Sequence, residues 1–181
     1  MKTTDTRALH LVLGGARSGK SRYAEQCAQE YQQRNTGSVV YVATAQANDA
    51  EMSERIEHHQ QDRPAYWYTV EEPIKLATAL MRIQNEAPDS IILIDCLTLW
   101  VSNCLLHSEE SWQQEKSALF NALEQINNPI IMVSNEVGWG IVPMGELSRR
   151  FVDESGRLHQ ELARVAQRVS LVVAGIPVKV K

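Results

Sequence analysis

The chain has 181 residues, of which 44% are hydrophobic and 22% charged, and its formal net charge is −4. This is the composition of a globular protein, and the length suits one hydrophobic core better than two, so we expect a single domain over residues 1–181. The mild acidity argues against nucleic acid and anionic membrane surfaces as partners. A strongly anionic ligand would need a local positive field instead.

The cysteines and the apolar segments bear on the cellular compartment. Cys27, Cys96 and Cys104 are odd in number and lack C-x-x-C spacing, which predicts free thiols in a reducing compartment and no zinc site. The polar start of the chain lacks the apolar stretch of a secretory signal. The longest apolar candidate, Cys96–Leu106, is interrupted by polar residues and is too short to span a bilayer. We therefore expect a cytoplasmic protein with no integral membrane segment.

Short apolar runs alternate with helical patterns along the chain. The runs are rich in Val, Ile and Leu without polar alternation, which is typical of strands covered on both faces. They are Leu9–Leu13, Val39–Ala43, Ser90–Asp95, Ile130–Ser134 and Ser170–Ala174. Helices are predicted at Lys20–Gln33, Asp49–Gln61, Pro73–Asn85, Ser111–Ile126 and Glu146–Arg168. Pro73 and the pair Ser111 and Gln114 are helix-start signals. The alternation predicts an α/β fold with a mainly parallel sheet flanked by helices.

Two segments depart from this alternation. The aromatic and β-branched run Tyr66–Val70 predicts an additional strand. The run Ile176–Val180 follows Gly175 too closely for a crossover connection, so we expect a C-terminal antiparallel hairpin.

The first glycine-rich segment matches the phosphate-binding pattern G-x-x-x-x-G-K-[ST] in full. Its residues are Gly14, Gly15, Ala16, Arg17, Ser18, Gly19, Lys20 and Ser21. The glycines allow backbone N–H groups to face phosphate oxygens, and the following helix adds the positive end of its dipole. Lys20 is expected to contact the β- and γ-phosphates and Ser21 to ligate Mg²⁺. The apolar run before the segment and the helical pattern after it indicate a nucleotide-binding P-loop.

Asp95 ends the apolar run Ser90–Asp95 and is the candidate acidic partner of the P-loop. A carboxylate at the end of a buried strand can hold Mg²⁺ directly or through water. The alternative is that Asp95 is the N-cap of the segment that begins at Cys96.

Two further polar segments are candidates for the site. His58 and His59 are adjacent, so on a helix their side chains point about 100° apart and at most one faces a given site. Taken alone, they are also consistent with solvated histidines near a helix C-terminus. Asn135–Pro143 follows an apolar strand, where ligands bind in open α/β sheets, although a capped turn would have the same residues. The chain contains no N-K-x-D guanine-reading motif.

Together these segments resemble one family. The sequence contains, in order, GGARSGKS, YVAT at Tyr41–Thr44, R-I-x-H-H-x-x-x-R-P at Arg55–Pro64, DCLT at Asp95–Thr98 and N-E-V-G-x-G-I-V-P at Asn135–Pro143. The set spans essentially the whole chain and is similar to the bifunctional adenosylcobinamide kinase/adenosylcobinamide-phosphate guanylyltransferases.

The resemblance implies two reactions of adenosylcobalamin biosynthesis. Adenosylcobinamide is phosphorylated on its aminopropanol hydroxyl by a nucleoside triphosphate. GMP is then transferred from GTP to adenosylcobinamide phosphate through a guanylyl-histidine, which the resemblance assigns to His59, with Lys20 as the second catalytic residue. It also implies a RecA-like fold, GTP, ATP and Mg²⁺ as cofactors, and a homotrimer. Beyond the P-loop, the nucleotide contacts implied are Ala43, Thr44, Ala45, Gln60, Gln61, Asp62, Arg63, Glu71 and Asp95.

Two other functions remain compatible with a P-loop. A single-function small-molecule kinase would form no covalent adduct with GTP. A RecA-like ATP-dependent binding protein would hydrolyse nucleotide and transfer nothing.

Overall fold

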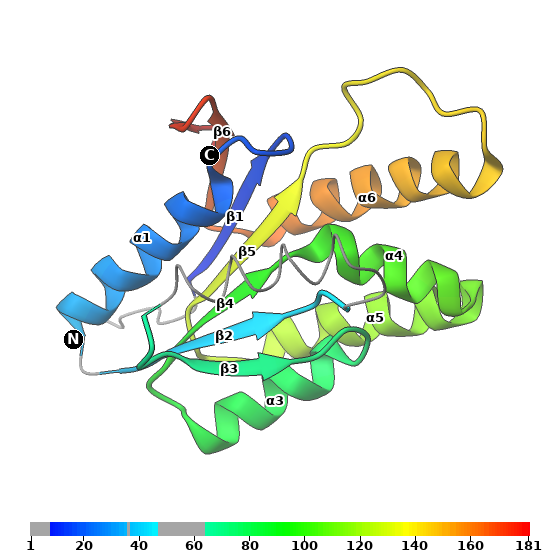
Figure 1. Cartoon of the computed structure of the whole chain (residues 1–181). Coiled ribbons are helices and arrows are strands. Elements are labelled where there is room, and N and C mark those ends of the chain that lie inside the picture. The colour runs from blue at the N-terminus through cyan, green and yellow to red at the C-terminus, as the bar shows by residue number, and fades with distance from the viewer. Residues whose placement is uncertain (1–7, 36, 47–63) are drawn as a thin grey trace.

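The computed structural model describes residues 8–35, 37–46 and 64–181. Its described strands form one seven-stranded sheet in the order β3-β2-β4-β5-β1-β6-β7 (Figure 1). Their bounds are β1 Leu9–Gly14, β2 Val39–Ala43, β3 Tyr68–Glu71, β4 Ile91–Asp95, β5 Ile130–Asn135, β6 Arg168–Val173 and β7 Ile176–Lys179. All described pairings are parallel except that of β6 with β7. The mainly parallel sheet and the terminal antiparallel hairpin predicted from the sequence are both confirmed.

Helices cover both faces of the sheet. Their bounds are α1 Lys20–Arg34, α3 Leu76–Glu86, α4 Leu97–His107, α5 Glu109–Gln125 and α6 Glu146–Val165. Of these, α1 packs on one face against β1, β4 and β5, whereas α3, α4, α5 and α6 form a layer on the other (Figure 1). The sheet therefore has two apolar cores, which explains why its central strands show no polar alternation.

The two cores differ in size. The smaller one, under α1, includes Ala24, Ala28 and Val133. The larger one contains the fully buried Trp100 and Trp112, whose ring centroids lie 5.4 Å apart in an edge-to-face arrangement.

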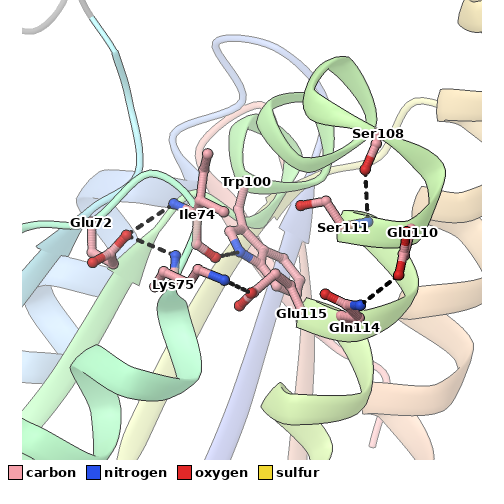
Figure 2. A network of polar contacts seen from close by, with 9 residues as sticks. All are labelled: Glu72, Ile74, Lys75, Trp100, Ser108, Glu110, Ser111, Gln114 and Glu115. Atoms are coloured by element: carbon pink, nitrogen blue, oxygen red, sulfur yellow. Dashed lines mark hydrogen bonds and ion pairs between the residues drawn. The ribbon is translucent and has the colours of Figure 1, made fainter.

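A polar network ties three helices of the larger layer together (Figure 2). The indole N–H of Trp100 in α4 donates to the carbonyl oxygen of Ile74 at 2.8 Å. Lys75, the N-cap of α3, donates from its ammonium to the buried carboxylate of Glu115 in α5 at 2.7 Å. The carboxylate of Glu72 accepts from the backbone N–H groups of Ile74 and Lys75. These bonds satisfy the polar groups at the start of α3, so this end of the layer has a defined geometry.

Several sequence predictions need correction. Helix α3 begins at Leu76, with Lys75 as its N-cap, rather than at Pro73. Cys96–Leu106 was not predicted as an element, and it forms α4. Helix α5 begins at Glu109 with Ser108 as its N-cap, not at Ser111, because the Ser108 hydroxyl accepts from the N–H of Ser111 at 3.0 Å. Helix α6 ends at Val165 rather than Arg168, which is the first residue of β6. The predicted strand Tyr66–Val70 starts later, at Tyr68, and pairs in parallel with β2. The predicted helix Asp49–Gln61 lies outside the described residues.

Candidate functional site

Several predicted site residues within the described ranges lie at the carboxyl ends of the parallel strands. In the sheet register Ala43 pairs with Glu71 on one side and with Asp95 on the other. On the far side of β4, Gly14 at the end of β1 pairs with Asn135 at the end of β5. Residues from five separate segments therefore share one edge, which is where open α/β sheets bind ligands.

The P-loop connects β1 to α1 at this edge. Gly19, at φ 90°, is the N-cap of α1, and its carbonyl oxygen accepts the N–H of Tyr23 at 3.0 Å. Arg17 also has a left-handed φ of 56°. The N–H of Ser18 donates to the Gly15 carbonyl at 3.2 Å, which closes the turn. The loop thus delivers the N-terminus of α1 to the strand edge, where it can bind an anion.

Two glycines of the loop are required by sterics. A Cβ on Gly14 would lie 2.7 Å from the carbonyl oxygen of Val172. Gly19 combines its positive φ with a close approach to Gly175, whose Cα would lie 3.2 Å from an added Cβ. Gly175 is in the turn of the C-terminal hairpin, and its N–H donates to the Ser18 carbonyl at 2.8 Å. The hairpin therefore supports the P-loop from outside.

Lys20 is the buried cation of the loop. Its side chain starts from the first turn of α1, the residue is 8% exposed, and Nζ donates to the Gly15 carbonyl oxygen at 3.2 Å. A carbonyl is a neutral partner, so the ammonium charge is available to a phosphate that displaces it. The contact of Lys20 with the β- and γ-phosphates stays a prediction.

Asp95 ends β4 and is not a helix cap. The N-cap of α4 is Cys96, so the capping alternative for Asp95 is wrong. The pKa of the Cys96 thiol is raised to about 11, mainly by burial; the Asp95 carboxylate acts in the same direction and the Lys20 ammonium in the opposite one. The Asp95 carboxylate and the Lys20 ammonium therefore both lie near Cys96, although β5 separates their strands.

The donor set fits Mg²⁺. Ser21 is in the first turn of α1 and Asp95 is partly exposed at the strand edge. A hydroxyl and a carboxylate are hard oxygen ligands, and Mg²⁺ usually takes only one or two protein groups beside water and phosphate. Within the described ranges, no group of three or more His, Cys, Asp or Glu side chains could hold a metal ion.

Thr44 forms hydrogen bonds within the protein through both its hydroxyl and its carbonyl. It is fully buried, and its hydroxyl donates to the Cys96 carbonyl at 2.7 Å and accepts from the Cys96 N–H at 2.9 Å. Its own carbonyl accepts from the side-chain amide of Asn103 at 2.9 Å. These bonds clamp the end of β2 to the start of α4, next to Asp95. Asn103 was not predicted from the sequence, because the three residues meet only through tertiary packing.

The remaining predicted residues divide into two groups. Glu71 is exposed at the end of β3, beside Ala43. His59, Gln60, Gln61, Asp62 and Arg63 lie outside the described residues, as does His58.

The loop after β5 carries polar groups that the sequence placed at this edge. The N–H of Glu136 donates to the Gly14 carbonyl at 3.0 Å, which ties the loop to the P-loop. Behind this loop, His159 of α6 is buried, and its Nε2 lies 2.7 Å from the hydroxyl oxygen of Ser134. Burial lowers the pKa of His159, and the nearby Glu136 carboxylate opposes that shift. The sequence analysis did not identify His159 or Ser134.

Comparison with known proteins gives matches over nearly the whole chain. Residues 10–180 match the family described as cobinamide kinase / cobinamide phosphate guanyltransferase. A bifunctional adenosylcobalamin biosynthesis protein of Pseudomonas aeruginosa is 51% identical over 172 residues, covering 94% of this chain and 96% of the relative. Proteins of the same description from Escherichia coli and Salmonella typhimurium are 40% and 42% identical, each covering 94% of this chain and 98% of the relative.

The solved structures that resemble this fold are more distant in sequence. A KaiC-like protein of Pyrococcus horikoshii has a TM-score of 0.52 at 15% identity, covering 91% of this chain and 70% of that one. The flagellar accessory protein FlaH of Methanocaldococcus jannaschii has a TM-score of 0.53 at 14% identity, with the same coverage. These likenesses support the RecA-like P-loop fold alone. The near-complete match and the close relatives show that the chain belongs to the cobinamide kinase / cobinamide phosphate guanyltransferase family.

Proposed function

We propose that the protein, as one P-loop nucleotide-binding transferase domain, catalyses two successive reactions of adenosylcobalamin biosynthesis. It phosphorylates adenosylcobinamide from ATP or GTP, and it transfers GMP from GTP to adenosylcobinamide phosphate with release of pyrophosphate. The two activities are those by which the family is described. The observation that carries the proposal is an intact P-loop next to Asp95 in a chain of this family.

The chain's own groups account for phosphate binding. The N–H groups of residues 15–21 and the N-terminus of α1 hold the phosphates, and the Lys20 ammonium leaves the Gly15 carbonyl to bind them. Ser21 and Asp95 would hold Mg²⁺, which neutralises phosphate charge when bound. Ala43, Ala45 and Glu71, at the same edge, are proposed to contact the rest of the nucleotide.

For Thr44 we propose an indirect role. Its hydroxyl and its carbonyl are both engaged within the chain, so it fixes the Asp95–Cys96 junction rather than binding through its side chain. Gln60, Gln61, Asp62 and Arg63 are proposed nucleotide contacts on the family resemblance alone.

We propose His59 as the residue that carries GMP. A neutral imidazole attacks the α-phosphorus of GTP, the bond from that phosphorus to the pyrophosphate oxygen breaks, and pyrophosphate leaves. The phosphate of adenosylcobinamide phosphate then displaces the imidazole. Two displacements at one phosphorus replace a single difficult transfer.

The experiment is labelling with α-³²P-GTP and Mg²⁺, followed by a denaturing gel. The native protein is expected to carry label that mild acid removes, because a phosphoramidate is acid-labile, and γ-labelled GTP should leave none. His59→Ala should lose the label and guanylyl transfer while keeping kinase activity, and His58→Ala serves as the matched control that keeps the label. Label in His59→Ala but not in His58→Ala would assign the adduct to the other histidine. An unlabelled native protein would favour a single-function kinase.

We also propose a cytoplasmic homotrimer. All three cysteines are free thiols, in accord with a reducing compartment. No helix of the described ranges combines the length and apolar character needed to cross a membrane. The loop between β5 and α6 extends from the sheet (Figure 1). It carries four apolar residues that are each at least 73% exposed, Trp139, Ile141, Val142 and Met144. Such apolar exposure fits a subunit interface. Light scattering of the native protein should give three times the chain mass.

A further inference from the structure

A chain of buried polar side chains lies behind the loop that follows β5, and the phosphate site described above does not use it. Its members are Thr98 of α4, Ser134 of β5 and His159 of α6, which are 5%, 1% and 6% exposed. The Thr98 and Ser134 hydroxyl oxygens are 3.2 Å apart, and Ser134 Oγ lies 2.7 Å from His159 Nε2. Buried polar groups must be satisfied, so the direction of each bond can be worked out.

One direction of the bonds starts at the backbone. The N–H of Asn135 donates to Thr98 Oγ1 at 2.7 Å, and Thr98 can donate its hydroxyl proton to Ser134. Ser134 in turn can donate to His159 Nε2. This arrangement requires a neutral ring that carries its proton on Nδ1. Burial lowers the pKa of His159, which is consistent with a neutral ring.

The other end of the chain is Glu136. His159 Nδ1 is buried and has no hydrogen-bond partner within the described residues, and the Glu136 carboxylate oxygen Oε2 lies 3.8 Å from it. A carboxylate in that direction favours the Nδ1–H tautomer. The separation exceeds a hydrogen bond by about 1 Å, and such contacts in unliganded sites often shorten when substrate binds. Each hydrogen bond from Thr98 through Ser134 to His159 is then donated in the direction of Glu136.

Glu136 is anchored beside the P-loop and still reaches solvent. Its N–H donates to the Gly14 carbonyl at 3.0 Å, and its Oε1 accepts from the N–H of Gly138 at 2.9 Å. Its side chain is 18% exposed. Among the described residues no lysine or arginine forms an ion pair with it, so lone pairs on the carboxylate are available to accept a proton.

We propose that Glu136 is the proton acceptor of the kinase reaction, and that His159 is a positioning residue that holds the Glu136 carboxylate. The inference rests on the proposed function. The aminopropanol hydroxyl oxygen forms a bond to the γ-phosphorus, and the bond from that phosphorus to the β–γ bridging oxygen breaks. The hydroxyl proton passes to the Glu136 carboxylate, and the nucleoside diphosphate leaves with the bridging oxygen. Glu136 then releases the proton to solvent.

The second reaction provides an internal control. Its acceptor is the phosphate of adenosylcobinamide phosphate, which is already ionised and has no hydroxyl proton to lose. Guanylyl transfer therefore needs no base at this position. A change at Glu136 should separate the two activities, whereas general damage to the P-loop would lower both.

The first test is Glu136→Gln, with the exposed Glu124→Gln on α5 as the matched control. Kinase kcat should fall about 10²- to 10⁴-fold, the range typical of a lost general base, with the KM for nucleotide changed less than about 3-fold. GMP transfer to adenosylcobinamide phosphate supplied directly should stay within about 3-fold of the native rate. Retained kinase activity, or equal loss of both reactions, would overturn the assignment.

The second test uses two substitutions of His159. Asn places an amide N–H near the position of Nδ1 and can donate to Glu136, whereas Gln places its amide near Nε2 and can contact only Ser134. His159→Asn should keep kinase kcat within about 10-fold, and His159→Gln should lose at least 10-fold more, with guanylyl transfer retained in both. A purely structural histidine predicts the reverse order or equal effects, and either would overturn the positioning role. Failure of the native protein to catalyse either reaction would contradict the proposed function instead.

Discussion

Two buried histidines in this protein each bond to a serine, yet their surroundings differ. His10 in β1 has its Nε2 2.9 Å from the Ser170 hydroxyl, and His159 in α6 has its Nε2 2.7 Å from the Ser134 hydroxyl. His10 packs edge-to-face on the ring of Tyr23, and its charged neighbour is Arg168. The charged neighbour of His159 is Glu136, at the strand edge.

The two histidines share a hydrogen bond to serine and differ in the sign of the charge beside them. Burial is the largest cause that lowers the pKa of His10, and Arg168 lowers it further, to about 4. The ring is thereby fixed in its neutral form. At His159 the carboxylate acts against burial. A neutral imidazole beside an anion can donate its ring N–H to that anion, whereas a neighbouring cation offers no acceptor.

The largest expected effect on the reaction rates comes from removing the Lys20 ammonium, and the effects of changes at the two histidines are compared with it. Lys20→Ala should lower both kinase and guanylyl transfer rates on the order of 10³-fold, because both reactions need a triphosphate held in the P-loop. Lys20→Arg is the partner variant, which keeps the charge but not the compact ammonium that fits the loop. Rates of both reactions and nucleotide affinity are measured for each protein. Near-native turnover of one reaction in Lys20→Ala would mean that this reaction does not use the P-loop.

The second prediction concerns His10 as the structural member of the pair. His10→Leu should lower the free energy of unfolding by about 1–3 kcal/mol, because the buried Ser170 hydroxyl loses its histidine partner. The kcat of both reactions should stay unchanged. The double variant His10→Leu/Ser170→Ala should recover part of the stability, since removing both partners costs less than removing one. Denaturant unfolding and steady-state rates provide the two readouts. A fall in kcat with unchanged stability would assign His10 to the site.

Much of the fold follows from local patterns. Each parallel strand is covered on both faces, so its apolar run is visible without knowledge of its neighbours. The P-loop is also local, because its glycines and Lys20 act through the backbone that connects one strand to one helix. Helix α4 was missed for a related reason. It is buried around most of its circumference, so Leu97–His107 shows no polar face that would reveal a helical period.

The candidate site was only partly predictable. Asn135 and Glu136 were expected at the sheet edge because they follow an apolar strand. His159 was not, because a single histidine in a long helix carries no signal of its own. Its serine partner is 25 residues away in the sequence and its carboxylate is 23 away. A network that forms only through tertiary packing has no characteristic residue spacing, so it cannot be predicted from the sequence pattern.

The third prediction is acid destabilisation of the native protein. The folded-state pKa of His10 is about 4 and its ordinary value is 6.5, so between these values the unfolded chain binds a proton that the native state does not. The contribution of His10 to stability is complete above about pH 6.5 and is lost as the pH falls toward 4. The slope of unfolding free energy with pH should approach about 1.4 kcal/mol per unit for this one group. Chemical unfolding between pH 4 and 7 measures it.

A control isolates the contribution of His10 to that slope. His10→Leu/Ser170→Ala should show a shallower pH dependence in the same window, by close to one proton. His159 keeps its own contribution there, because burial lowers its pKa as well. An unchanged slope in the double variant would show that His10 titrates normally in the folded protein.

The smallest expected effect tests the comparison most directly. Removing the charged neighbour should move the two histidine pKa values in opposite directions. Arg168→Gln removes a cation that lowers the pKa of His10, so that pKa should rise while remaining below 6.5, since burial persists. Glu136→Gln removes an anion that raises the pKa of His159, so that pKa should fall further. NMR titration of the ring Cε1 protons measures both values in each variant, and each histidine serves as the control for the other. An unchanged pKa of His159 in Glu136→Gln would mean that burial alone sets that value and that Glu136 does not act on His159.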